Sequence, residues 1–251
     1  MNTNNKARKL VAHRGDNTNY PENSYAALEA ALKAGALNIE FDIQVNADGA
    51  LLVFHDTDFK RVANLDVSIF DLSNDQIRAL SAHLPDRFGD KFLPTQVSCL
   101  DEILGLLQRY PQVHAFIEVK RESLARWGLV EVLDKILEAL RGFESQVTII
   151  SFSSSAIKYI QQHSKFRSGF VFYQYNECTR NLATILQPDY LICAYTIFPG
   201  KDKLWQGNWQ WMVYSINDLE LMKQLYLRDE ISLIETDNIS LMLQSLREKN
   251  I

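Results

Sequence analysis

The fold is decided by three short runs, LVAHRG at residues 10–15, IEFD at residues 39–42 and LLVFHD at residues 51–56. Residues 10–12 and 51–54 are apolar and favour buried strands, and each is followed directly by a histidine and a charged residue, whereas residues 39–42 alternate apolar and acidic side chains. Parallel α/β folds keep their chemistry at the carboxyl ends of their strands. We therefore expect residues 10–56 to hold much of a functional site.

Length and composition restrict the class of protein. The chain has 251 residues, of which 47% are hydrophobic and 23% are charged, so it can bury a large core. A net charge of −5 argues against broad binding to nucleic acid, which needs concentrated Lys and Arg. The polar residues 1–9 leave no room for a signal peptide, and no apolar run approaches the roughly 20 residues of a membrane helix. The three cysteines, Cys99, Cys178 and Cys193, are widely spaced and odd in number, which is typical of reduced thiols. Together these features predict a cytoplasmic protein with no integral membrane segment.

Strand-like runs alternate with helical stretches along the rest of the chain. We expect strands at residues 10–12, 37–45, 50–54, 114–119, 147–152, 169–173, 190–194, 211–216 and 231–234, and helices at residues 24–34, 99–110, 124–141, 154–163, 178–186, 219–227 and 240–249. The count of nearly eight strand–helix pairs predicts an α/β protein with one (β/α)8 TIM barrel, residues 1–251 forming a single domain. Residues 57–98 show no clean period and are expected to form a small insertion after the second strand, over the mouth of the site.

Three carboxylates are placed to converge in such a barrel. Residues two apart on a strand face the same way, so Glu40 and Asp42 point together, as do Glu118 and Lys120. If their strands are neighbours, the three carboxylates need a counter-charge, because like charges raise one another's pKa. One divalent cation with oxygen ligands, Ca²⁺ or Mg²⁺, meets that need, with Lys120 beside it. A buried ion network of these carboxylates with Arg14 and Lys120 is the structural alternative.

Two histidines supply side chains that can take up and release protons near neutral pH. With an ordinary pKa near 6.5, His13 and His55 can share general-base and general-acid duty on opposite sides of one bond. Arg14 offers a fork of donors that fits two phosphate oxygens. A cation, two basic side chains and two imidazoles together favour displacement at a phosphoryl centre.

The order of these motifs resembles the glycerophosphodiester phosphodiesterase family. The matching motifs are His13-Arg14-Gly15, Pro21-Glu22-Asn23-Ser24, Glu40-x-Asp42, Asp48-Gly49, Val53-x-His55-Asp56 and Glu118-x-Lys120, followed by the weaker Ser151-Phe152, Tyr214-Ser215-Ile216-Asn217-Asp218 and Thr236-Asp237. The insertion at residues 57–98 favours this family over the related sphingomyelinase D-type phospholipases. Some positions depart from the family pattern, with Tyr214 in place of Trp, Glu230 in place of Gly and Ile239 in place of Pro, and they concern the substrate pocket more than the reaction.

The resemblance implies a barrel hydrolase that cleaves a small-molecule glycerophosphodiester to glycerol 3-phosphate and an alcohol, with transient lipid contact possible. It implies that Glu40, Asp42 and Glu118 hold the cation, that His13 and His55 form the acid/base pair, and that Arg14 and Lys120 hold the phosphate. In the family mechanism, the metal-bound glycerol 2-hydroxyl attacks phosphorus, and water then opens the cyclic phosphate.

Two rival functions and several side-chain roles stay open. A lysophospholipase D-type enzyme with the same site would accept an acyl chain, and a non-catalytic barrel would only bind a phosphodiester. Asn23 is either a helix cap alone or a helix cap with a further role in the site, and Asp56 either orients His55 or caps a turn. Trp211 and Tyr214 either fill the barrel or line the pocket. The aromatic residues of the insertion either form a small core of their own or line a lipid-accepting mouth.

Overall fold

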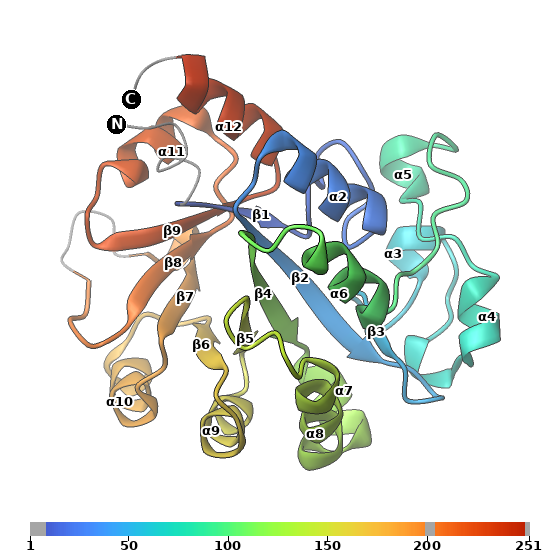
Figure 1. Ribbon diagram of the computed structural model, residues 1–251, viewed down its shortest axis with the longest axis horizontal. Helices are drawn as coiled ribbons and strands as arrows, with labels where there is room; N and C mark the ends of the chain where they lie inside the picture. Colours follow the sequence, from blue (N-terminus) through green and yellow to red (C-terminus); the bar gives the residue numbers. More distant parts are fainter. Residues whose placement is uncertain (1–8, 199–203, 249–251) are drawn as a thin grey trace.

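The computed structural model describes residues 9–198 and 204–248, and its centre is a closed ring of parallel strands (Figure 1). The ring strands are β1 (Leu10–His13), β2 (Asn38–Val45), β4 (His114–Val119), β5 (Val147–Ser151), β6 (Arg167–Phe172), β7 (Tyr190–Ala194), β8 (Gln210–Tyr214) and β9 (Ile231–Thr236). Each pairs in parallel with its neighbours, and β1 closes the ring by pairing with both β2 and β9. A further strand, β3 (Leu51–Val53), pairs antiparallel with β2 outside the ring. The predicted (β/α)8 barrel is confirmed, and the strand expected at residues 50–54 is β3.

Helices between the strands surround the barrel (Figure 1). They are α2 (Tyr25–Ala34), α6 (Leu100–Gln108), α7 (Arg121–Trp127), α8 (Leu129–Ala139), α9 (Ser154–His163), α10 (Glu177–Leu186), α11 (Leu219–Tyr226) and α12 (Ile239–Glu248), with a 3₁₀ turn η2 (Tyr195–Ile197) after β7. Helix α2 shows the expected end signals, because the Ser24 hydroxyl accepts from the Ala27 N–H and Gly35 ends the helix at φ 98°. None of the helices in the described ranges is long and apolar enough to cross a membrane.

The bounds of most predicted elements shift by one or two residues, and two of the differences are informative. The helix expected at residues 124–141 is two helices, α7 and α8, separated by Gly128. Gly128 has φ 97°, a conformation that ends α7, so an apolar period that continues across it does not make one helix. The last strand, expected to end at residue 234, continues through Glu235 and Thr236. Of the last predicted helix, Lys249 lies outside the described residues.

The barrel interior is built in layers that follow the two-residue period of the strands. One layer is apolar and includes Val11, Phe116, Ile150, Val171, Ile192, Met212 and Leu233. Two residues further along the same strands, towards their carboxyl ends, stand His13, Glu118, Phe152, Tyr173, Tyr214 and Glu235. The apolar layer is therefore the floor on which polar and aromatic side chains form a cavity.

The insertion at residues 57–98 packs around a small core of its own, beside β3 and away from the barrel axis (Figure 1). Its elements are α3 (Lys60–Ala63), η1 (Ile69–Asp71), α4 (Asn74–Arg78) and α5 (Pro85–Phe88). Phe59 and Ile69 are fully buried in this core, and Phe70 and Phe88 pack against it. The small-core interpretation is therefore confirmed for Phe70 and Phe88, whereas Phe92 lies outside this core and contacts Phe88 and Tyr20. The insertion also contacts the β1–α2 loop, because Arg87 donates to the Thr18 carbonyl at 3.1 Å.

Candidate active site

A cavity of about 310 Å³ lies at the carboxyl ends of the barrel strands, within the size range of small-molecule sites. Its lining includes six of the seven predicted site residues, His13, Arg14, Glu40, His55, Glu118 and Lys120. The seventh, Asp42, is 1% exposed and makes ion pairs with Arg14 and Lys120. The structure therefore brings all seven together, although they come from separate strands and from the turn after β3.

The three predicted metal ligands lie on adjacent strands. Strands β2 and β4 pair with Asp42 opposite Glu118, and one oxygen from each of Glu40, Asp42 and Glu118 lies within 4.8 Å of the others. Burial and the nearby Asp42 raise the pKa of Glu40 well above its ordinary value. Burial acts the same way on Asp42, but Arg14 and Lys120 outweigh it and hold the pKa of Asp42 below its ordinary value. The three carboxylates thus repel one another, and Arg14 and Lys120 neutralise only part of their negative charge.

Observations on this cluster fit a hard divalent cation. The buried Asp42 Oδ1 has no hydrogen bond of normal geometry, although Lys120 Nζ lies 3.3 Å away. Within the described residues, the carboxylates of Glu40, Asp42, Glu118 and Glu235 outnumber the two fixed cations, Arg14 and Lys120, that pair with them or share their cavity. Oxygen-only ligands and an excess of negative charge are what Ca²⁺ and Mg²⁺ sites provide.

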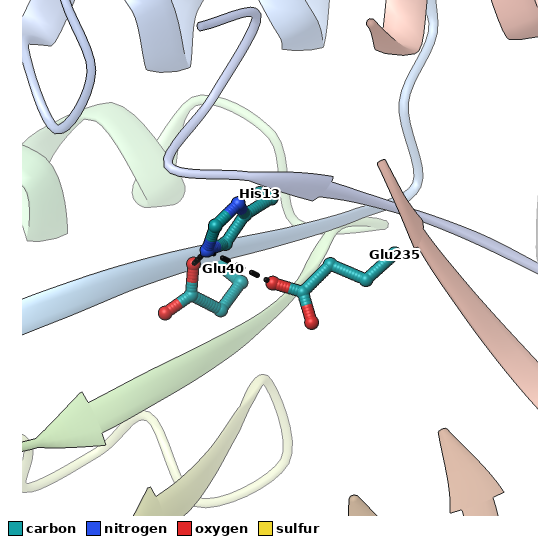
Figure 2. Close-up of side chains that lie close together, drawn as sticks. All are labelled: His13, Glu40 and Glu235. Atoms are coloured by element: carbon teal, nitrogen blue, oxygen red, sulfur yellow. Dashed lines mark ion pairs between the residues drawn. The ribbon is translucent and has the colours of Figure 1, made fainter. Parts of the chain in front are cut away.

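His13 is held through its Nδ1 atom, which lies 2.6 Å from Asp237 Oδ1. Asn17 donates to the same Asp237 oxygen at 2.8 Å. On the other side of the ring, Nε2 lies 3.6 Å from Glu235 Oε1 and 3.9 Å from Glu40 Oε2 (Figure 2). Burial lowers the pKa of His13, but Glu235 and Asp237 outweigh it and raise the pKa above 6.5. His13 is therefore oriented from outside the cavity and presents Nε2 to its interior.

His55 is held in the same manner by its neighbour in sequence. Its Nδ1 atom lies 2.6 Å from Asp56 Oδ1, and the other Asp56 oxygen accepts from Arg61 Nε at 2.8 Å. Burial raises the pKa of Asp56, but the hydrogen bonds from His55 and Arg61 outweigh it and lower the pKa to about 2. Of the two roles left open for Asp56, the structure shows contact with His55.

Arg14 is fixed by carboxylates on two sides. Its Nη1 atom donates to Glu22 at 2.7 Å, and its Nε atom lies 3.0 Å from Asp42 Oδ2. Glu22 also binds Arg61 through both of its oxygens, at 2.7 and 2.8 Å. Asn23 donates to Asp42 Oδ2 at 2.8 Å, so it supports the acidic cluster, and Ser24 caps helix α2. The run Pro21–Ser24 therefore joins the helix start to the site.

Sequence reasoning missed part of this site. Asp237 was expected only as part of a weak motif, and Glu235 was assigned no role because the strand was expected to end at residue 234. A signal was present, since Leu233 and Glu235 share one face of a strand and a glutamate is unusual on a buried face. Tyr214 lines the cavity, whereas Trp211 is 3% exposed and belongs to the surrounding core.

Comparison with known proteins agrees with this geometry. The family model described as the glycerophosphoryl diester phosphodiesterase family matches residues 13–237. A glycerophosphodiester phosphodiesterase from Caldanaerobacter subterraneus subsp. tengcongensis is 29% identical over 219 residues, which span 85% of this chain and 88% of that protein. Another from Bacillus altitudinis is 32% identical over 151 residues, 59% of this chain and 60% of that protein.

Solved structures share the fold at low sequence identity. A phosphodiesterase from Oleispira antarctica, in complex with the product sn-glycerol-3-phosphate, superposes with a TM-score of 0.83 at 19% identity over 96% of this chain and 97% of that one. A glycerophosphodiester phosphodiesterase from Agrobacterium tumefaciens gives a TM-score of 0.74 at 24% identity, over 94% and 99% of the two chains. Because the family model spans most of the sequence, this chain belongs to the glycerophosphoryl diester phosphodiesterase family.

Proposed function

We propose that this protein hydrolyses glycerophosphodiesters to glycerol 3-phosphate and an alcohol, with a divalent cation bound and with His13 and His55 as the acid/base pair. One observation carries the proposal, namely that two carboxylate-held imidazoles line the same cavity as Arg14, Lys120 and an acidic cluster. The names of the relatives and the product held by the Oleispira antarctica protein support this substrate class.

The histidines carry the proton transfers. Each is bound at Nδ1 by an aspartate, which fixes the ring and leaves Nε2 for the substrate. One imidazole takes the proton of the glycerol 2-hydroxyl as that oxygen bonds to phosphorus, and the other protonates the departing alcohol oxygen as its bond to phosphorus breaks. The resulting cyclic phosphate is opened by water with the two roles exchanged.

The charged residues position the phosphate and balance its charge. Lys120 lies 2.8 Å from Glu118 and 3.3 Å from Asp42, so its ammonium group is fixed at the edge of the acidic cluster. Arg14, held by Glu22 and Asp42, presents a second cation to the cavity. Glu40, Asp42 and Glu118 would hold the divalent cation, which when bound supplies charge neutralisation at the phosphoryl group.

The test is release of glycerol 3-phosphate from glycerophosphocholine and glycerophosphoethanolamine, with Mg²⁺ or Ca²⁺ supplied and with a chelator. We expect turnover by the wild type, loss of activity in the chelator, and a fall of about 10²- to 10⁴-fold in kcat for His13→Ala and for His55→Ala. His163→Ala is the matched control, because His163 is an exposed histidine on α9 outside the cavity.

Other outcomes would support different functions. Undiminished activity in the chelator would contradict the role of the cation, and full activity of either site variant would contradict its assignment. Faster turnover of lysophosphatidylcholine than of either glycerophosphodiester would favour the lysophospholipase D-type enzyme. Absence of turnover with all three substrates would favour a phosphodiester-binding module.

A further inference from the structure

Glu235 is a buried carboxylate to which the proposed reaction gives no role. It stands on β9 two residues after Leu233, which belongs to the apolar inner layer, so its side chain also points into the barrel (Figure 2). It is 3% exposed, yet it lines the cavity. The pairing of β9 with β1 places it beside His13.

The carboxylate of Glu235 is available to accept a hydrogen bond from a molecule in the cavity. Its contact with His13 Nε2, at 3.6 Å, is an ion-pair distance and not a hydrogen bond. Across residues 9–198 and 204–248, no side chain or backbone group donates a hydrogen bond to it. Glu235 lines the cavity, so a hydrogen-bond donor on a molecule bound there can reach its carboxylate oxygens.

A second cation is the first alternative, because Glu235, Glu40 and His13 Nε2 also lie within 4.8 Å of one another. Such a cation would occupy His13 Nε2, the atom that the proposed reaction uses for proton transfer. The cluster of Glu40, Asp42 and Glu118 already offers a cation site without this conflict. A neutral hydroxyl donor satisfies Glu235 and leaves His13 available.

We propose that Glu235 accepts a hydrogen bond from the terminal hydroxyl of the glycerol moiety and so selects glycerol diesters. The inference rests on the proposed function. For proton transfer, the glycerol 2-hydroxyl must approach a histidine Nε2 to about 2.6–3.2 Å. Since Glu235 Oε1 lies 3.6 Å from His13 Nε2, a hydroxyl on the next carbon falls within its reach.

This arrangement puts the constant part of the substrate on the His13 side of the cavity. The His13 side chain is 17% exposed and that of His55 is 32% exposed. The enclosed side suits the glycerol moiety, which every substrate shares. The more open side, at His55, suits the leaving alcohol, which varies between substrates.

Two esters that differ in one hydroxyl test the proposal. They are the p-nitrophenyl diester of glycerol 3-phosphate and the same diester of propane-1,2-diol 1-phosphate, which keeps the attacking hydroxyl and lacks the terminal one. The leaving group carries no hydroxyl, so it cannot supply the donor. With Mg²⁺ present, we expect wild-type kcat/KM to favour the glycerol ester by about 10- to 100-fold.

Two variants separate hydrogen bonding from other effects. Glu235→Leu removes the acceptor at similar volume, and we expect its preference for the glycerol ester to fall below about 2-fold, because kcat/KM falls further for the glycerol ester than for the propanediol ester. Glu235→Gln keeps an uncharged acceptor oxygen and should retain a preference of about 3- to 10-fold. Glu230→Gln is the control, because Glu230 precedes the same strand and pairs with Arg228.

Each contrary result has a distinct meaning. An equal fall for both esters in Glu235→Leu would overturn the proposal and indicate that Glu235 acts through His13. A wild type that hydrolyses both esters equally well would also overturn it. If the wild type hydrolyses neither ester, its turnover of glycerophosphocholine decides the proposed function, and calorimetric binding of sn-glycerol 3-phosphate against propane-1,2-diol 1-phosphate decides the role of Glu235. The proposal then requires at least 10-fold tighter binding of the glycerol compound by the wild type and equal binding by Glu235→Leu.

Discussion

His13 and His55 are held in the same way by different parts of the chain. Each has its Nδ1 atom 2.6 Å from an aspartate oxygen. The partner of His13 is Asp237, which follows the last barrel strand, whereas the partner of His55 is Asp56, the next residue. The first pair therefore exists only when β1 and β9 meet, and the second forms within one turn of the chain.

The surroundings of the two aspartates differ as well. Asp237 accepts from the uncharged amides of Asn17 and Asn217, so its negative charge acts mainly on His13. Asp56 shares its charge between His55 and the guanidinium of Arg61. Closure of the barrel therefore orients His13, one member of the proposed acid/base pair, whereas the insertion places a counter-charge beside the aspartate that holds His55.

The largest expected effect comes from neutralising these aspartates one at a time. We expect Asp237→Asn to lower kcat roughly 10³-fold, because loss of the analogous buried aspartate in a serine protease triad costs about 10⁴-fold. Asp56→Asn should lower kcat by about 10- to 100-fold, since Arg61 already offsets much of the Asp56 charge. Steady-state kinetics on glycerophosphocholine with Mg²⁺ measures both.

Asp75→Asn is the matched control, because Asp75 is an exposed aspartate on α4 outside the cavity. Thermal melts check that the variants fold. A loss in Asp56→Asn equal to or larger than that in Asp237→Asn would show that Arg61 does not weaken the Asp56 charge, and the comparison would fail.

The difference between the two histidine–aspartate pairs also explains which parts of the site could be predicted from the sequence. His55 and Asp56 are adjacent, and Glu40, Asp42 and Glu118 share the two-residue period of their strands, so local patterns predict them. Asp237 pairs with a histidine 224 residues away, and only the closed barrel brings the two together. Local period carries no information about that distance, which is why the motif at Thr236-Asp237 looked weak.

Other errors have physical causes of the same kind. The predicted helix at residues 124–141 kept its apolar period through Gly128, and the turn there depends on one backbone angle that hydrophobicity does not report. The insertion has helices of four or five residues, too short to show a period. In the part of the chain that the structure describes, the ion pairs from the insertion to the site come from Arg61, whose partners lie in two different loops.

A moderate effect is expected from removing that link. Arg61 binds Asp56 at 2.8 Å and Glu22 at 2.7 and 2.8 Å, so it positions the partners of both His55 and Arg14. We expect Arg61→Ala to lower kcat/KM by about 10-fold, with kcat reduced through His55 and KM raised through Arg14. Arg61→Lys should recover part of the loss but not all, because an ammonium group cannot bind Glu22 with two nitrogens.

Arg78→Ala controls for loss of a positive charge in the insertion, because Arg78 is exposed and pairs only with Asp75 in the described structure. Wild-type kinetics in Arg61→Ala would mean that the insertion does not position the site. A fall in thermal stability that Arg78→Ala shares would point to general destabilisation.

A third histidine, His114, shows what the carboxylate neighbours do for His13. It begins β4, at the end of the barrel opposite the cavity, and its Nε2 lies 2.8 Å from the Thr148 hydroxyl with no carboxylate partner in the described structure. Burial, with a smaller contribution from Arg167, lowers its pKa to about 4. His13 is also buried, yet its carboxylate neighbours raise its pKa.

The smallest expected effect is the pH dependence that this histidine gives to stability. Because the pKa of His114 is about 4 in the folded protein and near 6.5 in the unfolded chain, only the unfolded chain takes up the proton between those values. Stability from this group is therefore complete above pH 6.5 and falls as the pH drops towards 4, by about 1 kcal/mol at pH 5.5. Urea unfolding of the wild type and His114→Gln at pH 7.5 and 5.5 measures the difference, with His163→Gln as the control for removing a histidine. If His114→Gln loses as much stability as the wild type on acidification, the lowered pKa of His114 is wrong, and the contrast between His114 and His13 fails.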